Sequence, residues 1–111
     1  MTCRPGDLVL IPFPYSDLET SKKRPVLALT APDRHGDFIA LAVTSVPQTE
    51  HAIKLAASQL REGSLPKTSW IRLDKIFTLS ENSIVKSVGR IQHSFLGEVL
   101  KGLCGVVGYS R

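Results

Sequence analysis

The sequence lacks the features that mark several large classes of protein. No apolar stretch approaches the roughly 20 residues that a membrane-spanning helix needs. The stretch MTCRPGDLVL at the N-terminus has neither the long apolar core nor the cleavage site of a signal peptide. Repeats and low-complexity tracts are missing as well. We therefore expect a cytoplasmic protein that does not associate with a membrane.

Cysteine and histidine are too scarce and too scattered to suggest a metal centre. Cys3 and Cys104 lie near opposite ends of the chain, without metal-ligand spacing or a disulfide framework. His35, His51 and His93 fall in expected loops or at an expected helix start. A ribonuclease that uses a histidine pair stays a minor alternative, because imidazole titrates near neutral pH. We expect reduced cysteines, no metal site and no cofactor.

The composition predicts one globular domain over residues 1–111. Of the 111 residues, 42% are apolar and 22% are charged, which lies in the usual globular range. A chain of this length closes a single core. Its net charge of +4 favours polyanionic partners, nucleic acid among them, although the field is modest.

Short apolar runs separated by turn residues predict a mainly β protein with a C-terminal helix. Strands are expected over 6–13, 24–30, 38–46, 52–57, 69–79 and 83–91, and a polar loop of eleven residues over 13–23. The apolar spacing of 94–107 predicts a helix with Ser94 as its N-cap. Its apolar residues extend over too wide an arc for one small barrel to cover. The pattern indicates a small, strongly bent barrel and an interface on the helix.

A run of three cations stands at the start of the second predicted strand. Lys22, Lys23 and Arg24 directly precede Pro25. Proline disfavours the helical region for the residue before it, so Arg24 is expected to be extended and fixed. The run is either a solvated loop end or a binding site for an anion.

Two hydroxyls and an ion pair could complete such an anion site. Thr44 and Ser45 interrupt an apolar run where a central strand should end, and Arg72 and Asp74 share one face of a later strand. Guanidinium groups and hydroxyls can stabilise phosphate oxygens, and a carboxylate can accept a proton. By spacing alone, a structural salt bridge with strand-end hydrogen bonds is the more common outcome.

The chain resembles the MazF/PemK toxins over nearly its whole length. The similarity begins with GDLVLIPFPYSDLETSKKRPVLALT and continues through LAVTS, SWIRLDKIFTL and VGRI to the terminal helix. It implies an SH3-like barrel, a homodimer, and a metal-independent, sequence-selective endoribonuclease acting on single-stranded RNA. It also implies an acidic antitoxin as partner, and operator DNA bound through the toxin–antitoxin complex.

The resemblance assigns roles to the residues that match the family motifs. The arginine of the Arg-Pro motif falls on Arg24, and the threonine at the end of the central strand falls on Thr44, with Ser45 beside it. The Arg-x-Asp pair of the PemK branch falls on Arg72 and Asp74, in acid–base chemistry. Where the family often has glutamine, arginine and threonine, the chain has Lys75, Phe77 and Thr78. These departures concern RNA sequence preference and affinity rather than the proposed chemical groups.

The remaining candidates are contacts to substrate. Lys22 and Lys23 are expected to track phosphate together with Lys75, and Phe13 and Tyr15 to stack on unpaired bases. A core position is an equal alternative for Phe13. A barrel that binds nucleic acid or antitoxin without cutting is the second interpretation of the whole chain.

Overall fold

The computed structural model describes residues 1–12 and 22–109. Phe13 and Tyr15, both predicted to contact substrate, lie outside the described residues. In chain order the elements are β1 (Asp7–Pro12), β2 (Lys23–Ala28), β3 (Asp37–Thr44), β4 (Ala52–Leu55), η1 (Ala57–Gln59), β5 (Leu60–Gly63), β6 (Ser69–Ser80), η2 (Glu81–Ser83), β7 (Lys86–Ile91) and α1 (His93–Val106).

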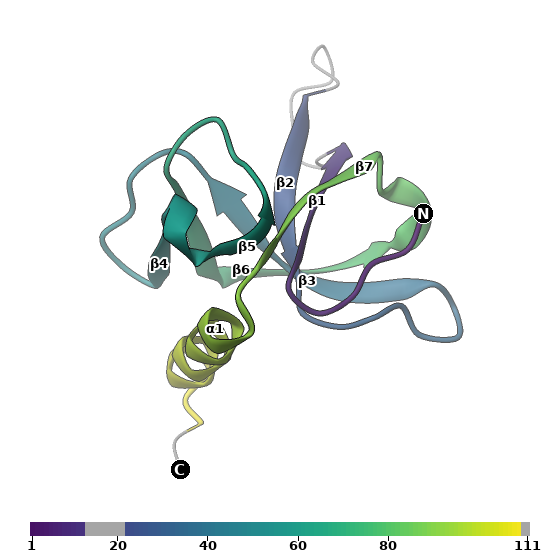
Figure 1. The fold of residues 1–111 in the computed structure, drawn as a ribbon. Helices are drawn as coiled ribbons and strands as arrows, with labels where there is room; N and C mark the ends of the chain where they lie inside the picture. Colours follow the sequence, from purple (N-terminus) through teal and green to yellow (C-terminus); the bar gives the residue numbers. More distant parts are fainter. Residues whose placement is uncertain (13–21, 110–111) are drawn as a thin grey trace.

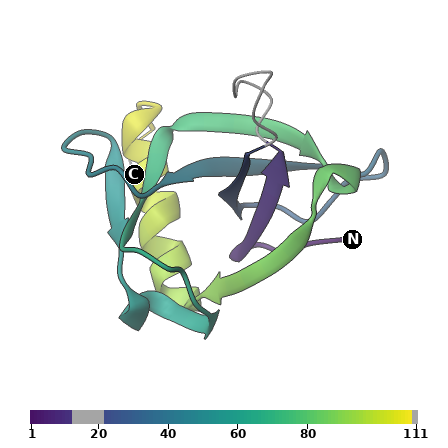
Figure 2. The same cartoon turned by 90° about the horizontal axis from the view of Figure 1, so that it is seen from above.

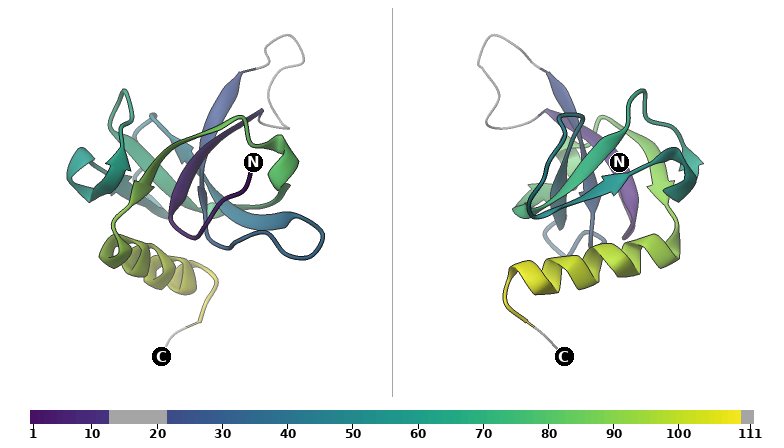
Figure 3. Two further views of the ribbon diagram at one scale, coloured as in Figure 1. Left: turned by 45° about the vertical axis from the view of Figure 1, so that its right-hand side comes forward. Right: turned by 90° about the vertical axis from the view of Figure 1, so that its left-hand side faces the viewer.

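The strands form one strongly curled antiparallel sheet in the order β4-β6-β3-β2-β1-β7-β5 (Figure 1). The view from above shows the strands bending around a common interior (Figure 2). The helix α1 lies along one end of this curled sheet (Figure 3). The prediction of a mainly β, strongly bent barrel with a C-terminal helix is confirmed.

Apolar residues are buried on both faces of the sheet, which explains why its central strands are nearly continuous apolar runs. The larger core, between the sheet and α1, is built around Leu8, Leu27, Leu41 and Ile71, all fully buried. A second core on the other face contains alternate residues of the same strands, including Val9, Val26 and Ala40.

The longest strand, β6, is interrupted by a bulge. Its residue Ile76 pairs with Leu41 of β3, but the next residue of β3, Ala42, pairs with Arg72. Residues 73–75 are therefore extra on β6, and the backbone amide of Leu73 donates instead to the carbonyl oxygen of His51 at 2.8 Å. A bulge of this kind bends a strand sharply and redirects its side chains.

Two local predictions are wrong. Residues 60–63, expected in a connection between strands, form β5. This strand is stabilised by its hydrogen bonds to β7, and its own sequence has no apolar pattern that predicts a strand. The helix begins at His93 with Gln92 as N-cap, so Ser94 is a helical residue and not the cap. The backbone amide of Gln92 donates to the carbonyl oxygen of Gln59 at 2.7 Å, which fixes where the helix begins.

The barrel covers only part of the apolar arc of α1, as the sequence predicts. Phe95, Leu96 and Val99 are buried against the larger core, whereas Leu100 and Val107 are 40% and 61% exposed. Within the described residues, no helix has both the length and the apolar content needed to cross a bilayer.

Candidate functional site

A groove of about 540 Å³ lies at the end of the sheet where β2 begins and β3 ends. Among the described residues, five that line it are cationic: Lys22, Lys23, Arg24, Lys67 and Lys86. Four described hydroxyl residues accompany them: Thr44, Ser45, Ser64 and Ser69. Among the described residues that line the groove, none is a carboxylate. The groove is thus an electropositive surface with hydroxyl donors, which suits a phosphate-bearing ligand.

Arg24 is exposed but stands on a rigid backbone. It belongs to β2, where it pairs with Ile11 of β1, and the following Pro25 pairs with Leu10. Ile11 is fully buried, so the strand under Arg24 is anchored in the core while the guanidinium lies in the groove wall. The expected extended conformation before Pro25 is confirmed.

Thr44 lies beside Arg24 on the same face of the sheet. Val26 of β2 pairs with Ala42 of β3. Arg24 is two positions before Val26, and Thr44 is two positions after Ala42. Side chains two positions apart share a face, so the two groove residues lie on adjacent strands at the same height. The structure therefore brings the Arg-Pro motif and the Thr-Ser strand end together.

The hydroxyl of Thr44 has a structural role that is compatible with a second contact. Its Oγ1 accepts a hydrogen bond from the backbone amide of Val46 at 3.1 Å, which stabilises the turn after β3. A hydroxyl accepts and also donates one proton, so this bond leaves the O–H available to a ligand. Ser45, the next residue, is exposed in the groove wall.

Arg72 is on the neighbouring strand β6 but does not line the groove. It pairs with Ala42, whereas Thr44 pairs with Trp70. Residues diagonal across a strand pair are separated by about 7–8 Å, and Arg72 and Thr44 stand in this relation. The predicted site residues thus fall into two groups, Arg24 with Thr44 and Ser45 in the groove, and Arg72 with Asp74 beyond it.

Arg72 and Asp74 form a loose ion pair across the bulge of β6. The Nε atom of Arg72 is 3.6 Å from the Oδ1 atom of Asp74, which is too long for a hydrogen bond. This Nε is buried and has no hydrogen-bond partner among the described residues. A buried polar atom without a hydrogen bond costs about 1–3 kcal/mol, and the charge of the nearby Asp74 carboxylate offsets part of this cost. Lys75, the next residue, is exposed and is not part of the groove wall.

Sequence reasoning missed four polar residues of the groove among those that the structure describes. Lys67, Ser64 and Ser69 belong to the connection between β5 and β6 or to its end, and Lys86 begins β7. Nothing in the local pattern marks them. These residues reach the groove because β7 pairs with β1 on one side and with β5 on the other, and β1 and β5 are far apart in the sequence.

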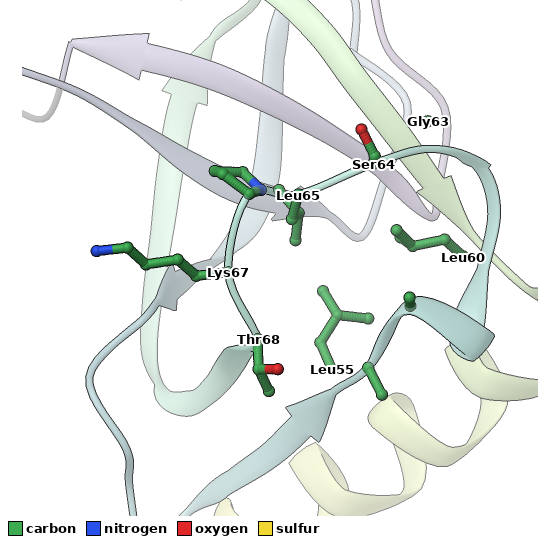
Figure 4. Close-up of a pocket in the computed structure, with 10 residues that line it drawn as sticks. Leu55, Leu60, Gly63, Ser64, Leu65, Lys67 and Thr68 are labelled. Atoms are coloured by element: carbon green, nitrogen blue, oxygen red, sulfur yellow. The ribbon is translucent and has the colours of Figure 1, made fainter.

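The connection that carries Lys67 also borders a smaller pocket of about 220 Å³. Leu55, Leu60 and Leu65 surround this pocket, and the side chain of Lys67 extends away from it (Figure 4). Leu55 is buried in the larger core. The apolar side of residues 64–68 therefore packs inward, while Lys67 contributes its charge to the groove.

Metal-ligating side chains are not clustered in the part of the chain that the structure describes, since no group of three or more His, Cys, Asp or Glu residues comes together there. The two cysteines are free, Cys3 buried and Cys104 exposed.

Comparison with solved structures shows the same fold in bacterial proteins. An endoribonuclease in complex with its cognate antitoxin from a Mycobacterial species is 18% identical, with a TM-score of 0.77 over 98% of both chains. A MazE–MazF crystal structure from Deinococcus radiodurans is 23% identical, with a TM-score of 0.76 over 99% of both chains. The Mycobacterium tuberculosis toxin MazF-mt6 is 15% identical, with a TM-score of 0.73 over 95% of this chain and 99% of that one.

A comparison with curated protein sequences returned no match. The model of one protein family, described as the PemK-like, MazF-like toxins of type II toxin–antitoxin systems, matches residues 4–107. This match covers the groove strands, the Arg72–Asp74 pair and α1. The chain therefore belongs to the PemK-like, MazF-like toxins of type II toxin–antitoxin systems.

Proposed function

We propose that this protein is a cytoplasmic, metal-independent endoribonuclease that cleaves single-stranded RNA in a sequence-selective manner. The observation that carries the proposal is the groove, in which Arg24, Thr44 and Ser45 meet on one wall among four lysines. The structural neighbours described as endoribonucleases support the same activity. The lysines bind the phosphate backbone, and the fixed guanidinium contacts the reacting phosphate.

The nucleophile in this proposal is the 2′-hydroxyl of the RNA. Its oxygen forms a bond to the adjacent phosphorus while its proton passes to the carboxylate of Asp74. The bond from phosphorus to the 5′-oxygen breaks, and that oxygen takes a proton from water. Arg24, Thr44 and Ser45 stabilise the charge on the phosphorane. The products carry 2′,3′-cyclic phosphate and 5′-hydroxyl ends.

Arg72 acts on the leaving-group side of the phosphate. Its help is electrostatic, because a guanidinium with a pKa above 12 is a poor proton donor. The side chain of Arg72 is 30% exposed, so part of it remains accessible to a phosphate. An RNA that engages both groups of residues lies across the end of β3, from the groove to the Arg72–Asp74 pair.

The partners of the proposed toxin follow from the charge of the groove. An acidic antitoxin segment that covers Lys22, Lys23 and Arg24 would block RNA by competition. The neighbours from Mycobacterial species and Deinococcus radiodurans are described in complex with antitoxin or MazE, which supports such a partner. We also propose a homodimer, and operator DNA binding through the toxin–antitoxin complex.

The test is incubation of the pure protein with mixed single-stranded RNA oligonucleotides in the presence of a chelator. Cleavage to fragments with 2′,3′-cyclic phosphate and 5′-hydroxyl ends is expected, and RNA with a 2′-deoxy nucleotide at the cut site should bind without reacting. An absolute requirement for magnesium, or cleavage of the 2′-deoxy substrate, would contradict the mechanism.

One observation favours a second candidate, a module that binds nucleic acid or antitoxin without cutting. The Arg72–Asp74 pair does not line the groove, so binding in the groove does not require the acid–base pair. On this interpretation the same oligonucleotides bind with strong salt dependence and remain intact after long incubation.

A further inference from the structure

A second basic hollow, distinct from the groove, lies at the other end of β1 and β7. Its volume is about 290 Å³, and it is lined by Arg4, Arg61, Arg90 and His93 together with Pro5, Ile91 and Leu96. We call it the arginine pocket. The strand β7 begins at the groove with Lys86 and reaches the arginine pocket four residues later at Arg90.

Asp7 fixes two of the arginines in the wall of this pocket. Its Oδ1 atom accepts a hydrogen bond from Nε of Arg90 at 2.8 Å, and its Oδ2 atom accepts one from the backbone amide of Arg4 at 2.8 Å. Asp7 is only 7% exposed, so both contacts are well shielded from water. The same carboxylate therefore holds the backbone of Arg4 and the side chain of Arg90.

Arg61 enters the pocket through a bulge. Leu60 of β5 pairs with Ile91 of β7, and Glu62 pairs with Arg90, so Arg61 is an extra residue opposite a single step of β7. A bulge redirects the side chain of the extra residue. Arg61 thereby lines the same hollow as Arg90 and Ile91.

The positive charge of the pocket is only partly neutralised. Asp7 balances Arg90, whereas neither Arg4 nor Arg61 has a carboxylate partner within salt-bridge distance in the described part of the chain. Two guanidinium groups thus remain for an anion. Arginine presents a planar fork of donors that matches the oxygens of a phosphate, and such charge-assisted bonds are the strong ones.

The first turn of α1 adds to the same wall through His93 and Leu96. The N-cap residue Gln92 makes no side-chain capping bond, and its Nε2 atom instead donates to the carbonyl oxygen of Leu60 at 3.2 Å. The first turn contains no acidic residue. A helix start without a side-chain cap is stabilised by an external anion, so the helix supports a ligand that the arginines attract.

We infer that the arginine pocket binds a phosphate group, either free in solution or terminal on an oligonucleotide. Its volume is at the lower end for small-molecule sites, which suits a phosphate with little more than one attached sugar. The inference does not rest on RNA cleavage in the groove, because no described residue lines both sites.

The test follows backbone amide signals of the whole protein by NMR during titration with inorganic phosphate. Because phosphate also enters the groove, the readout is restricted to the amides of Arg61, His93 and Leu96. These signals are expected to shift along a saturable curve. Arg61→Ala and Arg4→Ala should weaken that binding about tenfold or more, the scale of one charge-assisted hydrogen bond. Both residues are exposed, so the variants should fold.

The matched control is Lys67→Ala, which removes an exposed cation from the groove and should leave the phosphate affinity at these three amides unchanged. A dinucleotide with a 5′-phosphate is then compared with its 5′-hydroxyl counterpart. If the 5′-phosphorylated dinucleotide binds the pocket more tightly than inorganic phosphate does, the pocket is assigned to a terminal phosphate. If the 5′-phosphorylated dinucleotide and inorganic phosphate bind with equal affinity, the pocket is assigned to the free ion. Amide signals that do not shift saturably, or an affinity in Arg61→Ala and Arg4→Ala that equals that of the unsubstituted protein, would overturn the inference.

Discussion

Gly63 of β5 lies opposite Gly89 of β7, and neither position leaves room for a side chain. A methyl group at position 63 would collide with the carbonyl oxygen of Val88, and one at position 89 would lie 2.7 Å from the carbonyl oxygen of Glu62. Gly63 also has a positive φ of 78°, which favours glycine. This close approach places the start of the connection 64–68, and hence one wall of the groove.

Replacing Gly63 should therefore destabilise the fold. Gly63→Ala is expected to lower the free energy of unfolding by about 2–3 kcal/mol, because the strained backbone conformation and the collision with Val88 add. Gly97→Ala is the control, since Gly97 lies in α1 and no described atom comes within 4 Å of an added methyl group. It should be neutral or stabilise by up to about 1 kcal/mol. Urea denaturation measures both, and an unchanged midpoint for Gly63→Ala would refute the close approach of β5 and β7.

The two groups of site residues should separate in RNA cleavage. Arg24→Ala is expected to reduce the rate by on the order of 10²-fold or more, the scale of one lost transition-state contact. Asp74→Asn should slow cleavage while RNA affinity stays nearly intact, because in the proposed mechanism the carboxylate accepts a proton and contributes little to binding. Single-turnover rates and equilibrium binding of a 2′-deoxy analogue give the two quantities. Undiminished cleavage by Arg24→Ala would exclude the assigned role.

The lysines that sequence reasoning missed should appear in the salt dependence of RNA binding. Lys67→Ala and Lys86→Ala should each make the slope of log K against log salt less steep by about 0.7, the value for one single-strand phosphate contact. Lys54→Ala is the control, since Lys54 is exposed on β4 away from the groove. Fluorescence anisotropy at several salt concentrations measures the slopes. Equal slopes in all three variants would remove Lys67 and Lys86 from the RNA path.

The exposed apolar residues of α1 predict self-association. Leu100 and Val107 remain 40% and 61% exposed after the barrel has covered the opposite side of the helix. We expect light scattering to give about twice the chain mass of 12.1 kDa at micromolar concentration. Leu100→Glu should shift the mass toward the monomer. A monomeric wild-type protein under these conditions would contradict the proposed homodimer.

The cysteines should differ in reactivity. Burial raises the pKa of the Cys3 thiol from 9.0 to about 11, with smaller contributions from the charges of Asp7 and Glu81. The thiolate is the reactive form, so native Cys3 should resist alkylation at pH 8 while the exposed Cys104 reacts. The pKa of the Cys3 thiol is higher in the folded than in the unfolded protein. The contribution of this thiol to the free energy of unfolding is therefore complete below pH 9 and is lost as the pH rises toward 11. Mass spectrometry after brief alkylation should show one label, and two labels on the native protein would place Cys3 outside the core.

The barrel could be predicted because its strands carry their own signal. The run FIALAVTSV is apolar on both faces since β3 separates two cores, and this leaves few alternatives to a central strand. β5 could not be predicted in the same way. Its four residues include one apolar side chain, and its pairing with β7 depends on a bulge and on Gly63. Its conformation is decided by residues far away in the chain.

The candidate site, like the fold, could be predicted only in part. Arg24 and Thr44 could be proposed together because the strands that carry them are consecutive and pair. That the Arg72–Asp74 pair lies outside the groove could not be predicted, because Asp74 belongs to a bulge at residues 73–75 that interrupts the alternation of β6. A prediction from alternating polar and apolar residues requires a regular strand, whereas β6 is interrupted by a bulge.

The order of the strands also has a consequence for biosynthesis. The residues that line the groove extend along the chain from Leu10 to Val88, and the last of them belong to β7, which is inserted between β1 and β5. A growing chain that has not yet reached Val88 lacks one wall of the groove and leaves an edge of β1 unpaired. Domains fold as units once their residues have emerged from the ribosome. Any inhibitor that fits the groove therefore recognises the finished toxin and not the nascent polypeptide.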